Sequence, residues 1–454
     1  MKQTIIIKIE KLSNLGFGIA KDNKTGKVVF VQNACPGDVL RAEIFHENKN
    51  YSFANILEII TPSIHRVTPA CSIQKICGAC QLQFINYNYQ LCLKRQIIAD
   101  ALKNIAGLQP EIQPVIPSPN QFECRKKIQY AVRKSNIDYG IKIGYYKNKS
   151  HDLIDIKFCP LQPKICNDII DYIRQNAKNF GVTGYDEKNL TGELRHIVLR
   201  CSATGKILLT FVINSKNASK AIRELSENVY AKFDEISGVC INFNISKSNV
   251  ILTDNTICIC GKQFITEKIC NIEFKIETNT FFQVNPKTAQ NIFEFVKNYI
   301  SNNFDKPTIL DAYAGIATFG LILSDVAKSV SSVESCKESI DLAESVKTMN
   351  NIDNVELVHE DSEKFFAKLY ESGKNYDIII LDPPRKGCSE KTLEYCLKLA
   401  KKQIIYISCN PATLARDLKF LTQNGIKIKH IQPFDMFCHT YHVETVCILY
   451  NQKK

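Results

Sequence analysis

A cysteine stands where an apolar run gives way to a helix-like segment. Residues 403–408 are mostly apolar, and Cys409, Asn410 and Pro411 follow them directly. A thiol at this place lies near a helix N-terminus, whose positive dipole end favours the thiolate, the nucleophilic form of cysteine. Cys409 is therefore a candidate nucleophile. A buried structural cysteine is the alternative reading of the same position.

Two carboxylates fall at comparable places. Asp382 ends the apolar run 377–381 and begins Asp-Pro-Pro-Arg-Lys-Gly, where two prolines stiffen the chain and keep the carboxylate oriented. Glu444 comes just before the apolar stretch that ends the chain. Apolar surroundings raise the pKa of a carboxyl group towards that of a working base, so Glu444 is a candidate general base.

A turn of small residues indicates a nucleotide-containing cofactor. The segment 310–320 ends an apolar run, passes through Ala314, Gly315 and Ala317, and enters a helix, so that a cofactor can approach the backbone closely. About 20 residues later Glu334 ends the next apolar run, where it can accept hydrogen bonds from a ribose diol. An ordinary strand–helix turn with an unrelated acid is the alternative.

Four cysteines have a spacing that suggests a metal centre. Cys71, Cys77 and Cys80 lie within ten residues, and Cys159 is a plausible fourth ligand. Four thiolates suit an iron–sulfur cluster or tetrahedral zinc. The gap between the first two exceeds the common zinc spacing, which favours a cluster.

The elements that must position these groups fall into three regions. Residues 279–454 alternate strand-like and helix-like stretches, which predicts a multidomain α/β protein whose last domain is Rossmann-like, with a doubly wound parallel sheet. Residues 1–62 show short alternating runs between turns and predict an OB-like β-barrel. Residues 63–278 predict a mixed α+β central domain that carries the cluster, with a helix near 88–106 that packs on the catalytic domain.

Composition indicates the partner and the compartment. Lys and Arg number 58 against 46 Asp and Glu, and the net charge of +12 favours a polyanion such as nucleic acid. There is no signal-peptide pattern and no apolar run long enough to span a membrane, so we expect a cytoplasmic protein with no membrane partner. The odd count of 19 cysteines argues against a disulfide framework.

The signature segments Asp-Pro-Pro-Arg-Lys-Gly and Ser-Cys-Asn-Pro-Ala-Thr-Leu-Ala-Arg-Asp-Leu, with the cysteine spacing and the opening barrel, resemble the RNA uracil carbon-5 methyltransferase family over nearly the whole chain. The resemblance implies a TRAM domain that binds RNA, a [4Fe-4S] cluster of the 23S rRNA branch and S-adenosylmethionine as cofactor. It implies that Cys409 is the nucleophile and Glu444 the base. The implied cofactor residues are Gln283, Tyr313, Glu334 and Asp382.

By the same resemblance we expect a monomer that methylates carbon 5 of a uridine in 23S rRNA, with tRNA as the alternative substrate. Three positions depart from the family pattern: Ala314 stands where a cysteine is usual, Ala317 where a glycine is usual, and Thr318 where many members have asparagine. If φ at the two alanines is negative, the change is small and cofactor binding should survive.

Two other classes of function compete with this interpretation. DNA cytosine-5 methylation uses a similar thiol, but its cysteine typically follows a proline, whereas here the proline comes two residues later. A non-catalytic RNA-binding assembly factor would need the barrel and the basic surplus but not both Cys409 and Glu444. Candidate contacts to the RNA backbone are Lys126, Lys127, Arg133, Arg195 and His196.

Overall fold

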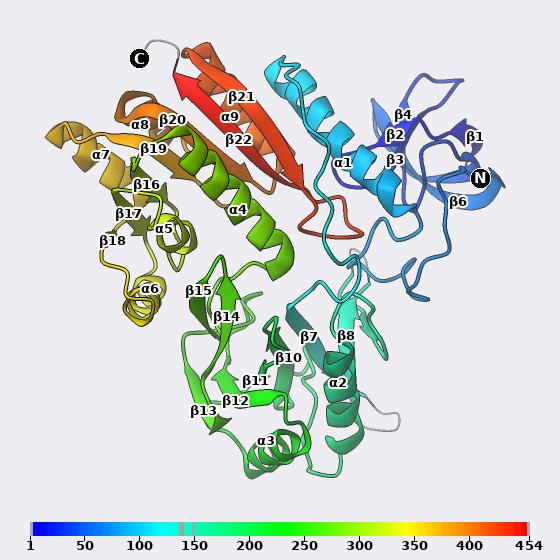
Figure 1. The fold of residues 1–454 in the computed structure, drawn as a ribbon. Coiled ribbons are helices and arrows are strands. Elements are labelled where there is room, and N and C mark those ends of the chain that lie inside the picture. The colour runs from blue at the N-terminus through cyan, green and yellow to red at the C-terminus, as the bar shows by residue number, and fades with distance from the viewer. Residues whose placement is uncertain (1–2, 136–139, 148–149, 452–454) are drawn as a thin grey trace. The chain divides into compact units, whose positions relative to one another are not determined.

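The computed structural model describes residues 3–135, 140–147 and 150–451, so the outer limits of the first and last predicted domains, residues 1 and 454, lie outside the described residues. The chain separates into two bodies, whose segments can be followed by residue number in the colours of Figure 1. The first consists of Met1–Lys75, Ala79–Ser118 and Ser362–Lys454, and the second of Ile76–Gly78 and Pro119–Asp361. This division does not fall at residues 62 and 278, so the domain boundaries predicted there stay predictions.

The first body begins with a six-stranded sheet in the order β1-β5-β6-β4-β3-β2. The Glu10 amide donates to the Ile19 carbonyl at 2.8 Å, which joins the end of β1 to β3 and curves the sheet towards the predicted barrel. Alternate side chains face an apolar core that includes Ile7, Val29 and Leu40. The strands are β1 (Thr4–Lys8), β2 (Lys11–Leu12), β3 (Gly18–Lys21), β4 (Val28–Val31), β5 (Val39–Glu47) and β6 (Tyr51–Thr61).

One helix follows the barrel. Helix α1 (Tyr87–Ala101) continues into a wider turn, η1 (Leu102–Ala106), so the helix predicted near 88–106 is confirmed. The Asn86 side chain accepts from the first amides of α1 and fixes where the helix begins. Both α1 and η1 pack against α9 (Pro411–Gln423), a helix from the far end of the chain.

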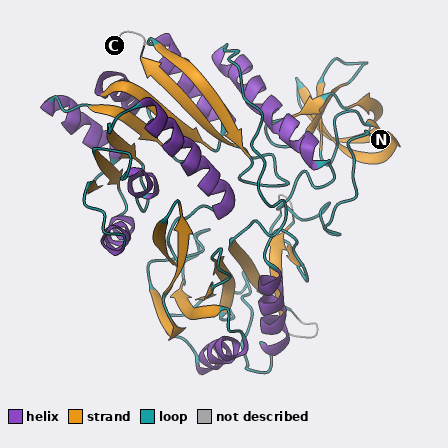
Figure 2. Cartoon of the chain, viewed as in Figure 1, coloured by secondary structure: helices purple, strands orange, loops and turns teal. Residues whose placement is uncertain are grey.

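The C-terminal part of the first body contains four strands in the order β19-β20-β22-β21 and three helices, seen in Figure 2 as alternating strands and helices. Strands β19 and β20 are parallel, but β22 runs antiparallel to both β20 and β21. The elements are α7 (Ser362–Ser372), β19 (Tyr376–Leu381), α8 (Glu390–Leu399), β20 (Ala400–Ser408), β21 (Ile426–Phe434) and β22 (Glu444–Asn451).

The prediction of a parallel sheet is therefore wrong for one strand of this part, β22. The connection 435–443 is too short for the crossover that parallel strands require, so β21 and β22 form a hairpin. This reversal has a consequence for the site, because it brings the first residue of β22, and not its last, to the edge where β19 and β20 end.

The second body contains a mixed seven-stranded sheet in the order β13-β12-β11-β10-β7-β8-β9, in agreement with the predicted α+β middle region. A separate hairpin joins β14 (Phe264–Ile269) to β15 (Ile272–Glu277). The other elements are β7 (Lys127–Lys134), β8 (Ile141–Tyr146), β9 (Leu153–Asp155), α2 (Lys164–Asn176), β10 (Leu194–Cys201), β11 (Ile207–Ile213), α3 (Lys220–Lys232), β12 (Ile236–Phe243) and β13 (Thr256–Gly261).

The second body also holds three parallel strands that correspond to the predicted ones, in the order β18-β17-β16. They alternate with helices as expected for a doubly wound arrangement. The elements are α4 (Pro286–Asn303), β16 (Thr308–Ala312), α5 (Thr318–Leu323), β17 (Ser329–Glu334), α6 (Lys337–Met349) and β18 (Val355–His359). None of the helices in the described ranges is both long and apolar enough to cross a membrane.

Candidate active site

The thiol and two carboxylates singled out in the sequence gather at one strand edge of the first body. Asp382 follows the last residue of β19 and Cys409 follows the last residue of β20. Ser408 pairs with Thr445 across β20 and β22, so Cys409 and Glu444 are the next residues on the two strands. The pKa of the Cys409 thiol responds to both Glu444 and Asp382, which places the three groups within electrostatic reach of one another.

The environment of Cys409 differs from the one expected. Burial, followed by the negative charges of Glu444 and Asp382, raises the pKa of the thiol to about 11, although the Arg385 guanidinium lowers it. The expected stabilisation of the thiolate by the helix end is thus outweighed. Cys409 is a protonated thiol at neutral pH in this state of the protein.

Glu444 has the environment predicted for a general base. Its side chain is buried, at 5% relative exposure. Burial raises the pKa of Glu444 well above its ordinary value, the Asp382 charge raises it further, and Arg385 opposes both. A carboxylate with a raised pKa holds a proton more strongly, which suits proton removal from carbon.

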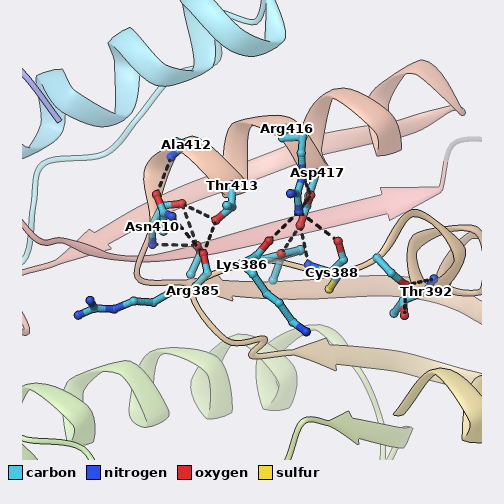
Figure 3. A network of polar contacts seen from close by, with 12 residues as sticks. Arg385, Lys386, Cys388, Thr392, Asn410, Ala412, Thr413, Arg416 and Asp417 are labelled. Atoms are coloured by element: carbon cyan, nitrogen blue, oxygen red, sulfur yellow. Dashed lines mark hydrogen bonds and ion pairs between the residues drawn. The ribbon is translucent and has the colours of Figure 1, made fainter. Parts of the chain in front are cut away.

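The loop that follows Asp382 is held by side chains of α9 (Figure 3). Asn410 and Thr413 donate to the Arg385 carbonyl at 3.0 and 3.2 Å. Arg416 donates to the carbonyls of Lys386 and Cys388 at 2.9 and 3.1 Å. The Arg385 side chain extends away from this network in Figure 3. Its positive charge lowers the pKa of the Cys409 thiol.

Asp417 completes the attachment of this loop. Its carboxylate accepts from the Cys388 amide at 2.9 Å and from the Tyr406 hydroxyl at 2.6 Å, and it pairs with Arg416. The prediction from the sequence missed these supporting residues. The signal was Asp417 itself, which lies at helical spacing from Leu414 and Leu421 on the apolar face of α9, because a buried charge requires partners.

The residues expected to hold a cofactor divide between the two bodies: Gln283, Tyr313 and Glu334 belong to the second, and Asp382 to the first. Glu334 ends β17, and its carboxylate accepts from the Gly315 amide at 2.9 Å and the Cys336 amide at 2.8 Å. Tyr313 directly follows β16, and Gln283 is half-buried ahead of α4.

The turn after β16 is sharper than the sequence suggested. Tyr313, Gly315 and Ala317 all have positive φ, at 63°, 56° and 56°. The condition of negative φ therefore fails at Ala317, whereas Ala314 is not among the positive-φ residues. Glycine adopts this left-handed conformation without strain, whereas alanine is strained in it. The residues around Ala317 must therefore maintain its conformation.

Open space lies beside this turn. A position built as Cβ on Gly315 meets no heavy atom within 4 Å. A cavity of about 590 Å³ in the second body is lined by Ile316 of the turn, by Cys336 and Glu338 beyond Glu334, and by polar residues of the central region such as Thr280. The Glu334 carboxylate, the half-buried turn and this adjoining space fit a ribose-bearing cofactor.

The four cysteines of the predicted metal centre also divide between the bodies. In the first body Gln83 connects one pair: it accepts from the Cys71 amide at 3.2 Å and donates to Cys80 Sγ at 3.2 Å. In the second body Cys77 and Cys159 both raise the pKa of the buried Tyr145, in addition to the effect of burial. Within the described ranges no three His, Cys, Asp or Glu side chains converge into a metal site.

Three of the candidate RNA-contacting residues have other engagements. Arg195 is buried and donates to the carbonyls of Asn244 and Ser246 at 2.6 and 2.7 Å. Burial and the charges of Arg133 and Arg195 lower the pKa of His196 to about 3, so its ring is neutral at pH 7. Arg133 pairs with Glu187. Lys127 lines the cavity.

The barrel carries a group of aromatic side chains that the sequence analysis did not predict. Phe17, Phe30, Phe45, Tyr51 and Phe53 form a continuous group, here called the aromatic face, with ring centroids 5.4 to 6.5 Å apart. Phe45 is 54% exposed and Tyr51 is 38% exposed. Strand alternation was the available signal, since these side chains lie on the face opposite the apolar core.

Strands that alternate with helices and carry acids at their carboxyl ends define an α/β protein of the class that binds a nucleotide-containing cofactor. A family model described as tRNA (uracil-5-)-methyltransferase matches residues 87–452, and one described as the TRAM domain matches residues 2–57. The chain belongs to the RNA uracil-5-methyltransferase family and carries an N-terminal TRAM domain.

Relatives match along the full length. An uncharacterized RNA methyltransferase of Clostridium tetani is 37% identical, with 100% of both chains covered. Another from Gloeobacter violaceus is 35% identical over 98% of this chain and 96% of that protein. The crystal structure of the Pyrococcus abyssi tRNA (uracil-54, C5)-methyltransferase in complex with S-adenosyl-L-homocysteine is 28% identical, with a TM-score of 0.78, and covers 99% of this chain and 100% of that one.

Proposed function

We propose that this protein methylates carbon 5 of a uridine in 23S rRNA, with S-adenosylmethionine as the methyl donor and a covalent cysteine–uracil intermediate. The observation that carries the proposal is the gathering of Cys409, Glu444 and Asp382 at one strand edge, with Arg385 within electrostatic reach. The cofactor is supported by the Glu334 turn and by the bound S-adenosyl-L-homocysteine of the Pyrococcus abyssi relative.

The chemistry explains why both a thiol and a carboxylate are needed. Carbon 5 of uracil is too weak a nucleophile to attack a methyl group unaided. Addition of a thiolate to carbon 6 pushes the electrons of the carbon 5–carbon 6 double bond towards the carbonyl at carbon 4, and the resulting enolate is nucleophilic at carbon 5. When bound, S-adenosylmethionine supplies an electrophilic methyl carbon on a sulfonium.

The residues then have separate tasks. Cys409 loses its proton to solvent, and its sulfur bonds to carbon 6. After methylation, Glu444 removes the proton from carbon 5, and the electrons of that bond re-form the double bond and expel Cys409 as a thiolate. Glu444 finally gives its proton to solvent. Asp382 and Gln283 orient the base, and Glu334 and Tyr313 hold the nucleoside part of the cofactor.

RNA recognition is assigned to the barrel. Aromatic rings stack on bases that are not paired, whatever their sequence, so the aromatic face suits a single-stranded segment beside the target. The reacting carbon is inaccessible in a stacked helix, and the target uridine therefore lies in a loop or is flipped out.

tRNA is the second candidate substrate. The matching family model and the solved Pyrococcus abyssi relative carry tRNA in their descriptions, whereas the cysteine spacing resembles the ribosomal RNA branch. Incubation with labelled S-adenosylmethionine and separate 23S rRNA and tRNA transcripts distinguishes them. Methylation of tRNA alone would overturn the ribosomal assignment, and labelling of neither RNA would favour an assembly factor.

The [4Fe-4S] cluster stays a proposal from cysteine spacing. We expect anaerobically purified protein to be brown and to contain about four irons per chain. Stoichiometric zinc would instead indicate a tetrahedral zinc site. The cytoplasmic location and the monomeric state also rest on the sequence and its resemblance.

The nucleophile is tested by trapping. RNA transcribed with 5-fluorouridine carries fluorine in place of the proton that Glu444 would remove, so a covalent complex should accumulate with the native enzyme. Cys409→Ala should abolish both this complex and methylation, while the exposed Cys92→Ala should retain both. Turnover by the Cys409→Ala enzyme would refute the covalent mechanism.

A further inference from the structure

The base Glu444 lies at the end of a hairpin whose loop is the segment 435–443. Phe434 and Glu444 are register partners, and they form the last pair of β21 and β22 before this loop. The direction in which the Glu444 carboxylate points therefore depends on how residues 435–443 are held.

Helix α1 holds the beginning of this loop. Lys94 forms an ion pair with Asp435, and both side chains are 0% exposed. The same Lys94 ammonium donates to the Phe437 carbonyl at 3.0 Å. The Tyr87 hydroxyl, also from α1, donates to the second oxygen of Asp435 at 2.7 Å.

The N-terminal segment also holds the middle of the loop. Gln90 of α1 hydrogen-bonds to His439 Nδ1 at 3.3 Å. The amides of Gln81 and Leu82 donate to the His439 carbonyl at 3.0 and 2.9 Å. His439 has a φ of 61°, an uncommon conformation for this residue type that the surrounding contacts maintain.

A strand-like attachment also fixes the β21 side of the hairpin, where the loop begins. The Ile116 amide donates to the Pro433 carbonyl at 2.9 Å, and the Asp435 amide donates to the Ile116 carbonyl at 2.9 Å. Asp435 is thus held by its backbone from one segment and by its side chain from α1. Every one of these contacts lies within the first body.

A buried Lys–Asp pair is poor evidence of a stability role, because desolvation of the two charges offsets most of their attraction. The pair nevertheless fixes the position of the loop, because Lys94 also donates to the Phe437 carbonyl and Asp435 also accepts from the Tyr87 hydroxyl. We propose that α1 is a positioning element for the reaction, in which Lys94 and Gln90 act through the loop 435–443 to aim the Glu444 carboxylate at carbon 5. This inference rests on the proposed function and deepens it.

Two variants and one control test the proposal. Lys94→Met combined with Asp435→Asn removes both charges together, so no uncompensated charge is left in the interior. Gln90→Leu removes the attachment of His439 and also the hydrogen bond that Gln90 donates to the Ile85 carbonyl at 2.8 Å. It leaves the ion pair intact and serves as the second test variant should the double variant not fold. Gln96→Leu is the matched control, because Gln96 lies on the exposed side of the same helix and contacts only Asp100 among the hydrogen bonds described for it.

The readout separates positioning from general damage. The complex with 5-fluorouridine RNA needs Cys409 but not proton removal by Glu444. We expect both test variants to form this complex at a rate within about twofold of native, and to turn over natural RNA at least about tenfold more slowly. A methylated covalent enzyme–RNA species should accumulate, detectable by mass spectrometry, and Gln96→Leu should behave as native.

The opposing outcomes are distinct. Equal slowing of complex formation and turnover would show general structural damage and overturn the positioning role, as would native turnover by the test variants. Failure of the native enzyme to form any complex would overturn the proposed function, and this inference with it. The RNA used is whichever of the 23S rRNA and tRNA transcripts the native enzyme methylates.

Discussion

The Cys409 thiol combines a reactive position with an environment that disfavours its ionisation. Burial and two neighbouring carboxylates raise its pKa to about 11, although Arg385 and a backbone hydrogen bond lower it. Such a thiol is protected from adventitious oxidation and alkylation, because these reactions need the thiolate.

This leads to a prediction of pH dependence. Thiolate is the form above the pKa, so alkylation of Cys409 by iodoacetamide in the free enzyme should rise about tenfold per pH unit from pH 7 to 10. Glu444→Gln removes a negative charge that raises the pKa, and its profile should therefore shift to lower pH. Quantitative mass spectrometry of the Cys409 peptide measures the rate. A profile that is flat above pH 7 would contradict the raised pKa.

The loop 382–389 shows how one element positions another. The two signature segments of the sequence are a structural pair: side chains of α9 hold the backbone that follows Asp382. Gly387 is required there, because its φ is 75° and an added Cβ would lie 2.6 Å from both Arg416 Nη2 and Asp417 Oδ2.

We therefore expect Gly387→Ala to lower the free energy of unfolding by more than the roughly 1–2 kcal/mol typical of a left-handed alanine, and to reduce methylation. Gly373→Ala is the matched control, because Gly373 has a φ of 70° but no heavy atom within 4 Å of an added Cβ. Urea denaturation measures both. Equal effects of the two substitutions would show that the contacts of Gly387 do not matter.

The aromatic face gives a second prediction at this scale. Base stacking on an aromatic ring contributes about 1–3 kcal/mol per base, so Phe45→Ala with Tyr51→Ala should weaken RNA binding by about tenfold or more. Both side chains are largely exposed, and the barrel core should be unaffected. Leu57→Ala, also exposed on β6, is the control. Unchanged affinity in a filter-binding assay would remove the face from the RNA surface.

At the scale of the whole molecule the basic surplus sets the response to salt. The net charge of +12 implies that RNA binding releases counterions, so affinity should fall by about tenfold or more between 50 and 200 mM KCl. Binding of S-adenosylmethionine, which involves few charges, should change little. Calorimetry or fluorescence titration at several salt concentrations measures both, and salt-independent RNA affinity would argue against a polyanionic substrate.

The sequence by itself determined the kinds of secondary-structure elements and the residues that can take part in chemistry. The barrel strands, the β16–β18 strands, the Cys409 and Glu444 pair and the family resemblance all depend on local pattern and short spacing, which a single chain displays directly. Glu444 was correctly expected to have a raised pKa, because an acid beside an apolar run is a local feature.

Only the tertiary structure decided how distant groups face one another. It showed that β22 is antiparallel to β20 and that Ala317 has a positive φ. It also showed that Arg195 is hydrogen-bonded within the protein and that the His196 ring is neutral at pH 7. At Cys409, burial outweighs the effect of the helix N-terminus on the pKa. It also joined α1 to the loop before Glu444, across more than 300 residues of chain. Desolvation and charge–charge effects depend on all atoms that surround a group, and spacing along the chain does not specify those atoms.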